Sequence, residues 1–436
     1  MADDRIYPGV KLLERGELDY LVCECLAERT IARETLNRKR APERGYTPML
    51  EERVRAFLPL CQAQDVRMVS NMGAANPLGA AQALRRETEA LGLGKVSCAV
   101  VTGDEVTELV RAHPQLKLME TGEPVESLLP RLASANAYLG ADVVARALDT
   151  GARAVITGRV ADPSLFLGVM MHHFGWPYDD LARLAAGTVA AHLLECSVQV
   201  TGGYFADPGK KDVAGLADIA YPYADVTRAG GVTIGKTPGS GGRVDRMTCT
   251  EQLLYEIHDP AQYITPDCVL DLTEVEFEET GDAAVAVRGA IGKPRTASYK
   301  TVVGYFDGYI GVGEIGYAGI NAVARARLAA EVVQERFRLE GGTASELQVD
   351  LIGLTSLHGD TGASAEPYEV RLRVAGRCPD KRSADLLGDE VRQLNMQGPA
   401  GPGGPMNFGA REIIAVQSLL MPREWVRPEI TLLEQA

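Results

Sequence analysis

The sequence lacks an uncharged apolar run long enough for a transmembrane helix, which takes about 20 residues. Its opening, MADDRIYPGV, also lacks the basic segment followed by an apolar run that marks a secretory signal. We therefore expect a cytoplasmic protein with no membrane partner.

Aromatic residues are scarce, at 6% of the chain, and they are not interleaved with basic residues as a nucleic-acid platform requires. The formal net charge of -14 also opposes contact with polyphosphate backbones. We expect no nucleic-acid partner. Small acidic substrates remain compatible with this charge, because local basic groups and helix N-termini decide what a pocket binds.

Metal-ligand spacings are missing as well. The eight cysteines form no C-x-x-C pair, the six histidines show no ligand spacing, and there is no H-E-x-x-H. We expect reduced, mostly buried thiols and no required metal or cofactor, with coenzyme A possible as a substrate carrier. Magnesium stays open, because Glu24, Glu28, Asp104 and Asp162 could converge and scattered oxygen ligands have no diagnostic spacing.

The chain has 436 residues, too many for one ordinary core, so we expect two lobes. Residues 1–205 alternate apolar strand-like runs with helical patterns, which predicts an α/β lobe with a mainly parallel, doubly wound-like sheet. The expected strands are 19–25, 66–71, 96–101 and 154–157, and the clearest helices are 49–64 and 141–150.

Residues 206–436 are richer in glycine and proline and predict a second, β-rich α+β lobe. Short alternating stretches fill 269–311, and a helix is expected at 320–339. The run at 397–405 can be neither helix nor central strand, so we expect a surface or binding loop there.

Two glycine motifs match nucleotide-binding patterns without their context. Residues 230–237 fit the P-loop spacing, but Pro238 and Gly239 break the helix that should follow, and Val-Thr-Ile favours a strand. Residues 311–316 fit G-x-G-x-x-G, but no crossover and no ribose-binding acid follow, which favours a structural glycine-rich turn.

The turn from Lys236 to Gly242 precedes a helical stretch at 250–257. Such a turn can present N–H donors and the positive end of the helix dipole to a carboxylate or a coenzyme A phosphate. It can equally be an ordinary loop that uses glycine for positive φ. The candidate anion-binding residues here are Lys236, Gly239, Gly241 and Gly242.

Polar residues follow the ends of the expected parallel strands, which should meet at one rim. Glu24 and Glu28 can donate or accept protons, and Asn76 can donate to an enolate. Arg159 can hold a carboxylate, with Asp162 as its orienting partner. The alternative is that these residues form surface or capping ion pairs.

Several long motifs occur in an order that resembles the AtuA (acyclic terpene utilisation) family over nearly the entire chain. They occupy residues 18–30, 70–77, 157–164, 199–205, 236–242, 250–256 and 313–319.

The resemblance implies catabolism of citronellol- and geraniol-type terpenoids through acyl-coenzyme A esters. It adds weight to the matching polar residues without assigning them chemistry: Asn71, Asn76, Arg159, Asp162, Gln199 and Lys236. The family usually opens with a glycine-rich strand and turn ahead of a pair matched here by Asp4 and Arg5. Some relatives carry a C-terminal ferredoxin-like domain marked by Ser-Gly-Asp-Lys-Gly. That motif is absent, so we expect the family core alone, across both lobes.

We therefore predict an enzyme of small carboxylate or acyl-thioester metabolism, a lyase or hydratase that uses Glu24 as acid or base next to a carbonyl. One alternative is a hydrolase of a thioester or amide that uses water or a cysteine such as Cys23, Cys25 or Cys196. Another is a non-catalytic accessory subunit of an acyl-coenzyme A carboxylase. A homo-oligomer is expected for a metabolic enzyme of this size.

Overall fold

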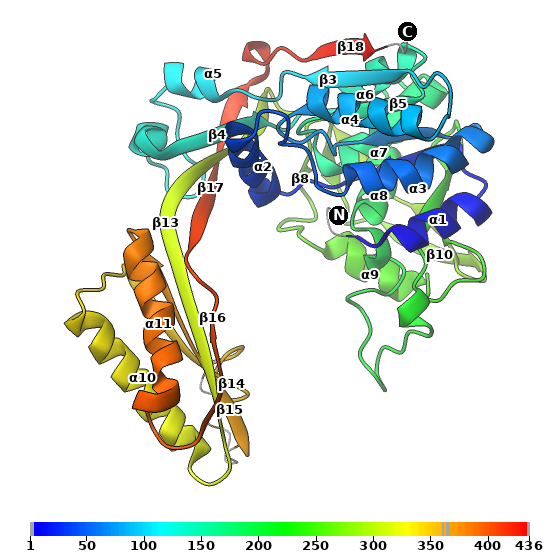
Figure 1. Ribbon diagram of the computed structural model, residues 1–436. Helices are drawn as coiled ribbons and strands as arrows, with labels where there is room; N and C mark the ends of the chain where they lie inside the picture. Colours follow the sequence, from blue (N-terminus) through cyan, green and yellow to red (C-terminus); the bar gives the residue numbers. More distant parts are fainter. Residues whose placement is uncertain (1–3, 360–361, 363–366, 434–436) are drawn as a thin grey trace. The chain divides into compact units, whose positions relative to one another are not determined.

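The computed structural model describes residues 4–359, 362 and 367–433. The chain divides into two compact units, which are described separately (Figure 1). The first unit comprises residues 1–304 and 416–436, and the second comprises residues 305–415. The mixed α/β class predicted from the sequence is confirmed, but the units do not divide at residue 205.

Four parallel strands and one antiparallel edge strand form the main sheet of the first unit, in the order β1-β2-β5-β3-β18. Alternation of apolar strand runs with helices produces this pairing, because parallel neighbours need crossover connections. The strands are β1 (Tyr20–Cys23), β2 (Arg67–Ser70), β5 (Ala154–Thr157), β3 (Cys98–Thr102) and β18 (Glu429–Leu433).

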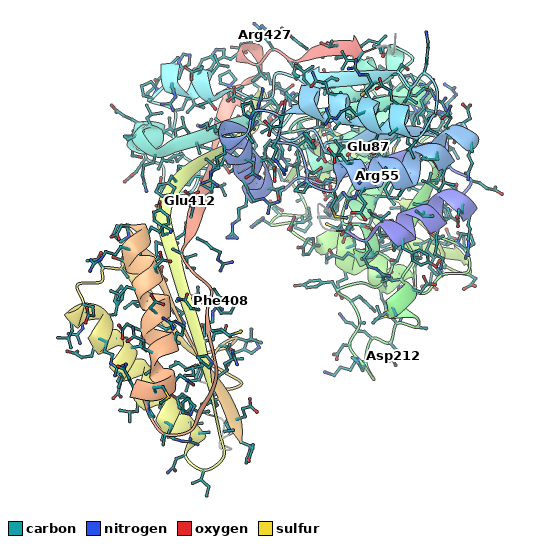
Figure 2. The ribbon with its side chains drawn as sticks, in the orientation of Figure 1. Arg55, Glu87, Asp212, Phe408, Glu412 and Arg427 are labelled. Atoms are coloured by element: carbon teal, nitrogen blue, oxygen red, sulfur yellow. The ribbon has the colours of Figure 1, made fainter. Side chains whose placement is uncertain are left out.

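Helices cover both faces of this sheet. Helices α3 (Leu50–Ala63) and α4 (Pro77–Ala90) bury Met68, Val100 and Ile156 on one face. The alternate residue Val155 is equally buried on the other face, where α6 (Ala141–Asp149) contacts β3 and β5. Arg55 of α3 and Glu87 of α4 add an ion pair 2.9 Å long (Figure 2). The expected helices 49–64 and 141–150 are thus confirmed.

Two antiparallel sheets of the first unit pack against helix α8 (Leu181–Glu195). One sheet has the order β10-β11-β7-β6, and a smaller one has the order β12-β9-β8. Leu193 of α8 shares a core with Ile234 and Leu270 from these sheets. The predicted boundary at 205 would cut through this core, which explains why the two parts form one unit. The strands are β6 (Pro222–Val226), β7 (Val232–Lys236), β8 (Tyr263–Ile264), β9 (Val269–Asp271), β10 (Glu276–Gly281), β11 (Ala284–Arg288) and β12 (Ile291–Lys293).

Further helices, one strand and several 3₁₀ turns complete the first unit. Among the described residues, no helix is both long and apolar enough to cross a membrane. The other helices are α1 (Ile6–Arg15), α2 (Glu28–Arg40), α5 (Thr107–Ala112), α7 (Asp162–Phe174) and α9 (Arg246–Leu254). Strand β4 spans Leu132–Ala137, and 3₁₀ turns lie at Val125–Arg131, Ser197–Gln199, Leu216–Asp218 and Arg423–Trp425.

The second unit has the sheet order β14-β15-β13-β16, and every pairing along it is antiparallel. Helices α10 and α11 lie on one side of the sheet (Figure 1). The elements are β13 (Ser298–Ala318, which begins in the first unit), α10 (Ala322–Leu339), β14 (Glu346–Ile352), β15 (Glu369–Cys378), α11 (Lys381–Gln397), β16 (Pro402–Asn407) and β17 (Arg411–Pro422).

The chain order β-α-β-β-α-β with this sheet order is a ferredoxin-like topology. This unit lies inside the chain, at residues 305–415, and the Ser-Gly-Asp-Lys-Gly motif that marks the C-terminal domain of some relatives is absent. The predicted helix at 320–339 is confirmed as α10.

Two glycine-rich segments of this unit are strands rather than loops. The G-x-G-x-x-G match lies inside β13, where a Cβ on Gly311 would come 2.1 Å from the carbonyl oxygen of Ala384 in α11. The glycines thus allow close helix packing, and the predicted turn is wrong. Residues 402–405 belong to β16, an edge strand that pairs with β13. The loop predicted for this part of the run at 397–405 is therefore wrong, whereas the prediction that it is neither helix nor central strand is confirmed.

Candidate functional site

The turns after the four parallel strands meet at one rim, as their polar residues predict. Glu24 follows β1 and is 8% exposed. Its Oε1 accepts hydrogen bonds from the Leu26 backbone N–H at 2.7 Å and from Asn71 Nδ2 at 3.0 Å. Asn71 follows β2, and its Oδ1 accepts from the Cys25 backbone N–H at 2.7 Å. Asn71 therefore positions Glu24 by joining the two turns.

Arg159 follows β5 and lies at the centre of the cluster with only 1% of its surface exposed. Its Nη1 donates to the Leu26 carbonyl at 2.6 Å and forms an ion pair with Asp162 at 2.8 Å. The guanidinium lies 4.0 Å from the centre of the Tyr138 ring. The predicted pairing of Arg159 with Asp162 is confirmed, and these contacts order the turn that carries Glu24.

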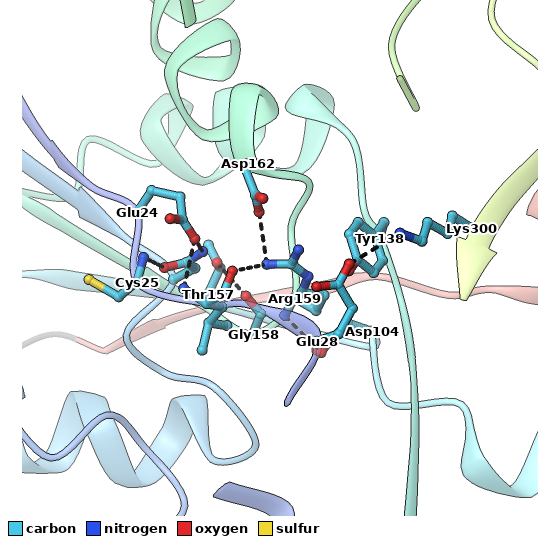
Figure 3. A network of polar contacts seen from close by, with 12 residues as sticks. Glu24, Cys25, Glu28, Asp104, Tyr138, Thr157, Gly158, Arg159, Asp162 and Lys300 are labelled. Carbon is cyan, nitrogen blue, oxygen red and sulfur yellow. Dashed lines mark hydrogen bonds and ion pairs between the residues drawn. The ribbon is translucent and has the colours of Figure 1, made fainter. Parts of the chain in front are cut away.

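Glu28 begins helix α2 beside the same arginine. Tyr138 donates to its Oε1 at 2.6 Å, and Lys300 Nζ lies 3.1 Å from that oxygen. Burial alone would raise the pKa of Glu28, but Arg159, the Tyr138 hydrogen bond and Lys300 lower it to about 2. Glu28 is therefore a fixed anion near neutral pH rather than a proton donor, and Figure 3 shows it on the far side of Arg159 from Glu24.

Asp104 completes the cluster from the turn after β3, and it is 3% exposed. Its Oδ2 accepts from the Arg159 backbone N–H at 2.8 Å and from Asn136 Nδ2 at 2.9 Å. Burial raises the pKa of Asp104 to about 6, more than these two hydrogen bonds lower it. The position of Asp104 after a strand and a glycine could have identified it as a residue of this cluster from the sequence. No local sequence pattern identifies Tyr138 or Lys300 as members of the cluster.

A cavity of about 310 Å³ opens beside this cluster, within the first unit. Its lining includes Glu24 and Glu195, the last residue of α8, together with the buried Arg53. Most of its other lining is apolar or aromatic, including Leu12, Leu21, Phe57, Phe166, Val169, Met170, Phe174 and Leu194. Glu24 thus belongs both to the polar cluster and to the cavity wall, whereas sequence reasoning missed Glu195 because no motif surrounds it.

Asn76 does not act where the sequence suggested. It caps helix α4, accepting from the Gly79 backbone N–H at 3.1 Å. Its Nδ2 donates to the carbonyls of Pro42 at 3.2 Å and Arg44 at 2.8 Å. Both amide hydrogens are therefore used within the fold, and the predicted oxyanion donor is replaced by a structural cap.

The glycine turn at 236–242 is also used internally. Lys236 Nζ donates to the Ser240 carbonyl at 2.7 Å, and the N–H groups of Gly241 and Gly242 donate to backbone carbonyls. The Asp245 carboxylate caps the following helix, α9, so the dipole end that was to receive an anion is occupied. Positive φ at Gly239 and Gly242 agrees with the ordinary-loop interpretation. Gln199 lies in a 3₁₀ turn, and among the described residues it forms no side-chain hydrogen bond or ion pair with the cluster.

The cysteines named as possible nucleophiles are not activated. Burial raises the pKa of Cys23 to about 11 and that of Cys25 and Cys196 to about 12. A thiol needs a lowered pKa or an adjacent base to attack a carbonyl. The nearest histidine in sequence to Cys196 is His192, which contacts Glu195 instead.

Metal ligands do not gather here either. In the part of the chain that the structure describes, no group of three or more His, Cys, Asp or Glu side chains could hold a metal ion. The four carboxylates considered for magnesium, Glu24, Glu28, Asp104 and Asp162, therefore form no such group.

The sequence profile described as acyclic terpene utilisation family protein AtuA matches residues 1–432. The chain belongs to the AtuA family. No curated protein sequence and no solved structure matches it. The family's name points to a catabolic role for this AtuA member, and the match spans both compact units.

Proposed function

We propose that this AtuA protein is a lyase or hydratase that moves a proton next to the carbonyl of a small carboxylic acid or its thioester. The substrate would carry an apolar, branched chain of the kind found in acyclic terpenoid acids. The observation that carries the proposal is the position of Glu24, which lies where a rigid polar network meets an apolar-walled cavity.

Glu24 has the properties of a positioned acid or base. Two hydrogen bonds hold Oε1, and among the described residues Oε2 has no hydrogen-bond partner. A carboxylate fixed by one oxygen presents the other in a defined direction, so little reorganisation is needed when a proton moves. The network behind it, formed by Asn71, Arg159 and Asp162, supplies that rigidity.

The cavity supports an apolar acyl chain. Its volume of about 310 Å³ lies at the lower end of small-molecule sites, which span about 300–1,000 Å³. Side chains such as Phe57, Phe166 and Met170 can contact a branched hydrocarbon, and burial of each CH₂ group contributes about 0.8 kcal/mol. Arg53 places positive charge in the same wall, where a carboxylate or carbonyl oxygen would benefit from it.

Arg159 has a positioning role in this proposal. It was predicted to hold a substrate carboxylate, but it does not line the cavity, and its Nη1 is engaged by Leu26 and Asp162. Its loss would release the turn that carries Glu24. Arg159→Lys would keep the charge but lose the planar contact with the Tyr138 ring, so it should lower turnover without removing binding.

The test is turnover of branched, unsaturated acids of the citronellic and geranic type, as free acids and as coenzyme A thioesters, with water addition or loss followed by mass spectrometry. Glu24→Gln should lower turnover at least about 100-fold, because it removes the proton-transfer group and keeps the shape. Glu14→Gln, an exposed change in α1, serves as the matched control. Unchanged turnover in Glu24→Gln would refute the assignment.

A further inference from the structure

We propose that Glu195, backed by His192, is the base that removes the proton next to the substrate carbonyl. This inference rests on the proposed function, and it leaves Glu24 to protonate the departing oxygen. The two carboxylates line the same cavity, Glu24 from the turn after β1 and Glu195 from the end of α8.

Glu195 is nine-tenths buried and incompletely satisfied. It is 9% exposed, and its Oε2 is buried without a hydrogen-bond partner among the described residues. A buried carboxylate oxygen left unpaired is costly, so natural structures rarely keep one without a use. Glu195 lines the cavity, so a ligand there would lie next to the side chain that carries this unpaired oxygen.

The other oxygen of Glu195 is tied to an imidazole. His192 lies one helical turn earlier, and its Nδ1 is 2.8 Å from Glu195 Oε1. Its Nε2 is 3.2 Å from the carbonyl oxygen of Leu253, which can only accept, so Nε2 carries a hydrogen. The contact between Nδ1 and Oε1 therefore holds one proton, shared between the two side chains, while Oε2 is left as an acceptor.

This pair can take up a proton and hold the added positive charge on the imidazole. When Oε2 of Glu195 accepts a proton, Oε1 can pass its own to Nδ1 of His192. The positive charge then lies on the imidazole, where the carboxylate of Glu256 favours it.

The groups around the pair agree with a shared proton. Burial raises the pKa of Glu195, His192 lowers it, and Glu24 and Glu256 raise it again. The net effect is a pKa above the usual value for glutamate. Burial lowers the pKa of His192, but Glu195 raises it above its usual value. Asp162, Cys196 and Tyr263 also interact with Glu195, and Arg53, His173, Tyr221 and Asp225 lie elsewhere in the cavity wall.

The step balances as follows in the eliminating direction. Oε2 of Glu195 forms an O–H bond as the α-carbon C–H bond breaks, and the released electron pair forms the C=C bond. The C–O bond at the neighbouring carbon breaks with its pair on oxygen, and protonated Glu24 gives that oxygen its proton, so water leaves. Glu195 and His192 then return one proton to Glu24 through solvent. Hydration is the reverse sequence.

The experiment runs the full-length protein in D₂O with the same acids and thioesters and follows deuterium next to the carbonyl by mass spectrometry. Glu195→Gln should lose this exchange at least about 100-fold, because glutamine keeps the contact with His192 but accepts no proton. Glu24→Gln should keep the exchange and lose net water transfer. Glu274→Gln, an exposed change, should match the wild type, and thermal unfolding verifies that each variant folds.

His192 is tested as a positioning residue through the pH profile. In His192→Gln the base is a carboxyl without the imidazole that lowers its pKa, so the acidic limb of kcat/KM should move to higher pH and the maximum should fall. The exposed His258→Gln is the control and should leave the profile in place. A His192→Gln profile with an unmoved acidic limb would overturn the shared-proton arrangement.

The outcomes separate the two proposals. Exchange that persists in folded Glu195→Gln but disappears in Glu24→Gln would overturn the role of Glu195 and leave the proposed function standing. Absence of both exchange and turnover in the wild type with every acid and thioester would overturn the proposed function itself, and the role of Glu195 with it.

Discussion

Replacing the buried Asp104 by asparagine should remove a pH dependence from the stability of the first unit. Asp104 is 3% exposed, and burial raises its pKa to about 6 from 3.8. Its Oδ2 accepts from the Arg159 N–H and from Asn136, and an asparagine oxygen can accept the same two bonds. Asp104→Asn therefore deletes the ionisation while keeping the hydrogen bonds.

The size and sign follow from linkage. Between the two pKa values the native state holds a proton on Asp104 that the unfolded chain has released, so stability falls as pH rises through this range. One pKa unit corresponds to about 1.4 kcal/mol, so a rise from 3.8 to about 6 corresponds to about 3 kcal/mol. This stabilisation is fully present below the unfolded value and is lost above the folded one. The free energy of unfolding of Asp104→Asn, relative to wild type, should therefore increase by about 3 kcal/mol from about pH 4 to about pH 7.

Urea unfolding followed by tryptophan fluorescence measures this difference. The chain has two tryptophans, Trp176 and Trp425, and both belong to the first unit, so their emission follows the part that contains Asp104. Glu105→Gln removes a neighbouring exposed carboxylate and should give a difference that is flat with pH. Stability curves of Asp104→Asn and wild type that run parallel from about pH 4 to 7 would refute the reasoning.

Two further outcomes are expected. Gly311→Ala should lower the free energy of unfolding of the second unit by about 1–3 kcal/mol, because the new Cβ would lie 2.1 Å from the Ala384 carbonyl oxygen; circular dichroism against Gly403→Ala, whose Cβ would meet nothing, provides the comparison. Iodoacetamide at neutral pH should label Cys25 and Cys196 slowly and leave turnover intact, since burial raises both pKa values to about 12. Rapid single-site labelling with loss of turnover would instead favour the hydrolase.

Local sequence patterns predicted the rim because strand ends are visible in the sequence. Glu24, Asn71 and Arg159 each follow a short apolar run, and parallel pairing brings such turns together. The same reasoning could not find Lys300, which reaches Glu28 from a strand 272 residues later. Contacts between residues so far apart in sequence depend on how whole layers pack, and local hydrophobic periodicity does not predict them.

Two of the predicted site residues are engaged in hydrogen bonds within the fold. Asn76 and Lys236 have side chains suited to ligands, but their hydrogen bonds are used by nearby carbonyls. A sequence shows which groups can bind and does not show which are already satisfied. Glu195 is the opposite case, since an unremarkable helix end becomes notable only when one of its oxygens is found without a partner.

Strand β18 has a consequence for synthesis on the ribosome. It pairs residues 429–433 with residues 98–102 of β3, the outer parallel strand of the main sheet. The nascent chain must therefore expose this edge of β3 until residues 429–433 have emerged. Exposed strand edges invite pairing with other chains, so the unfinished protein is an aggregation hazard. Slow translation or early termination should accordingly yield insoluble material, a demand on chaperones that the finished fold does not reveal.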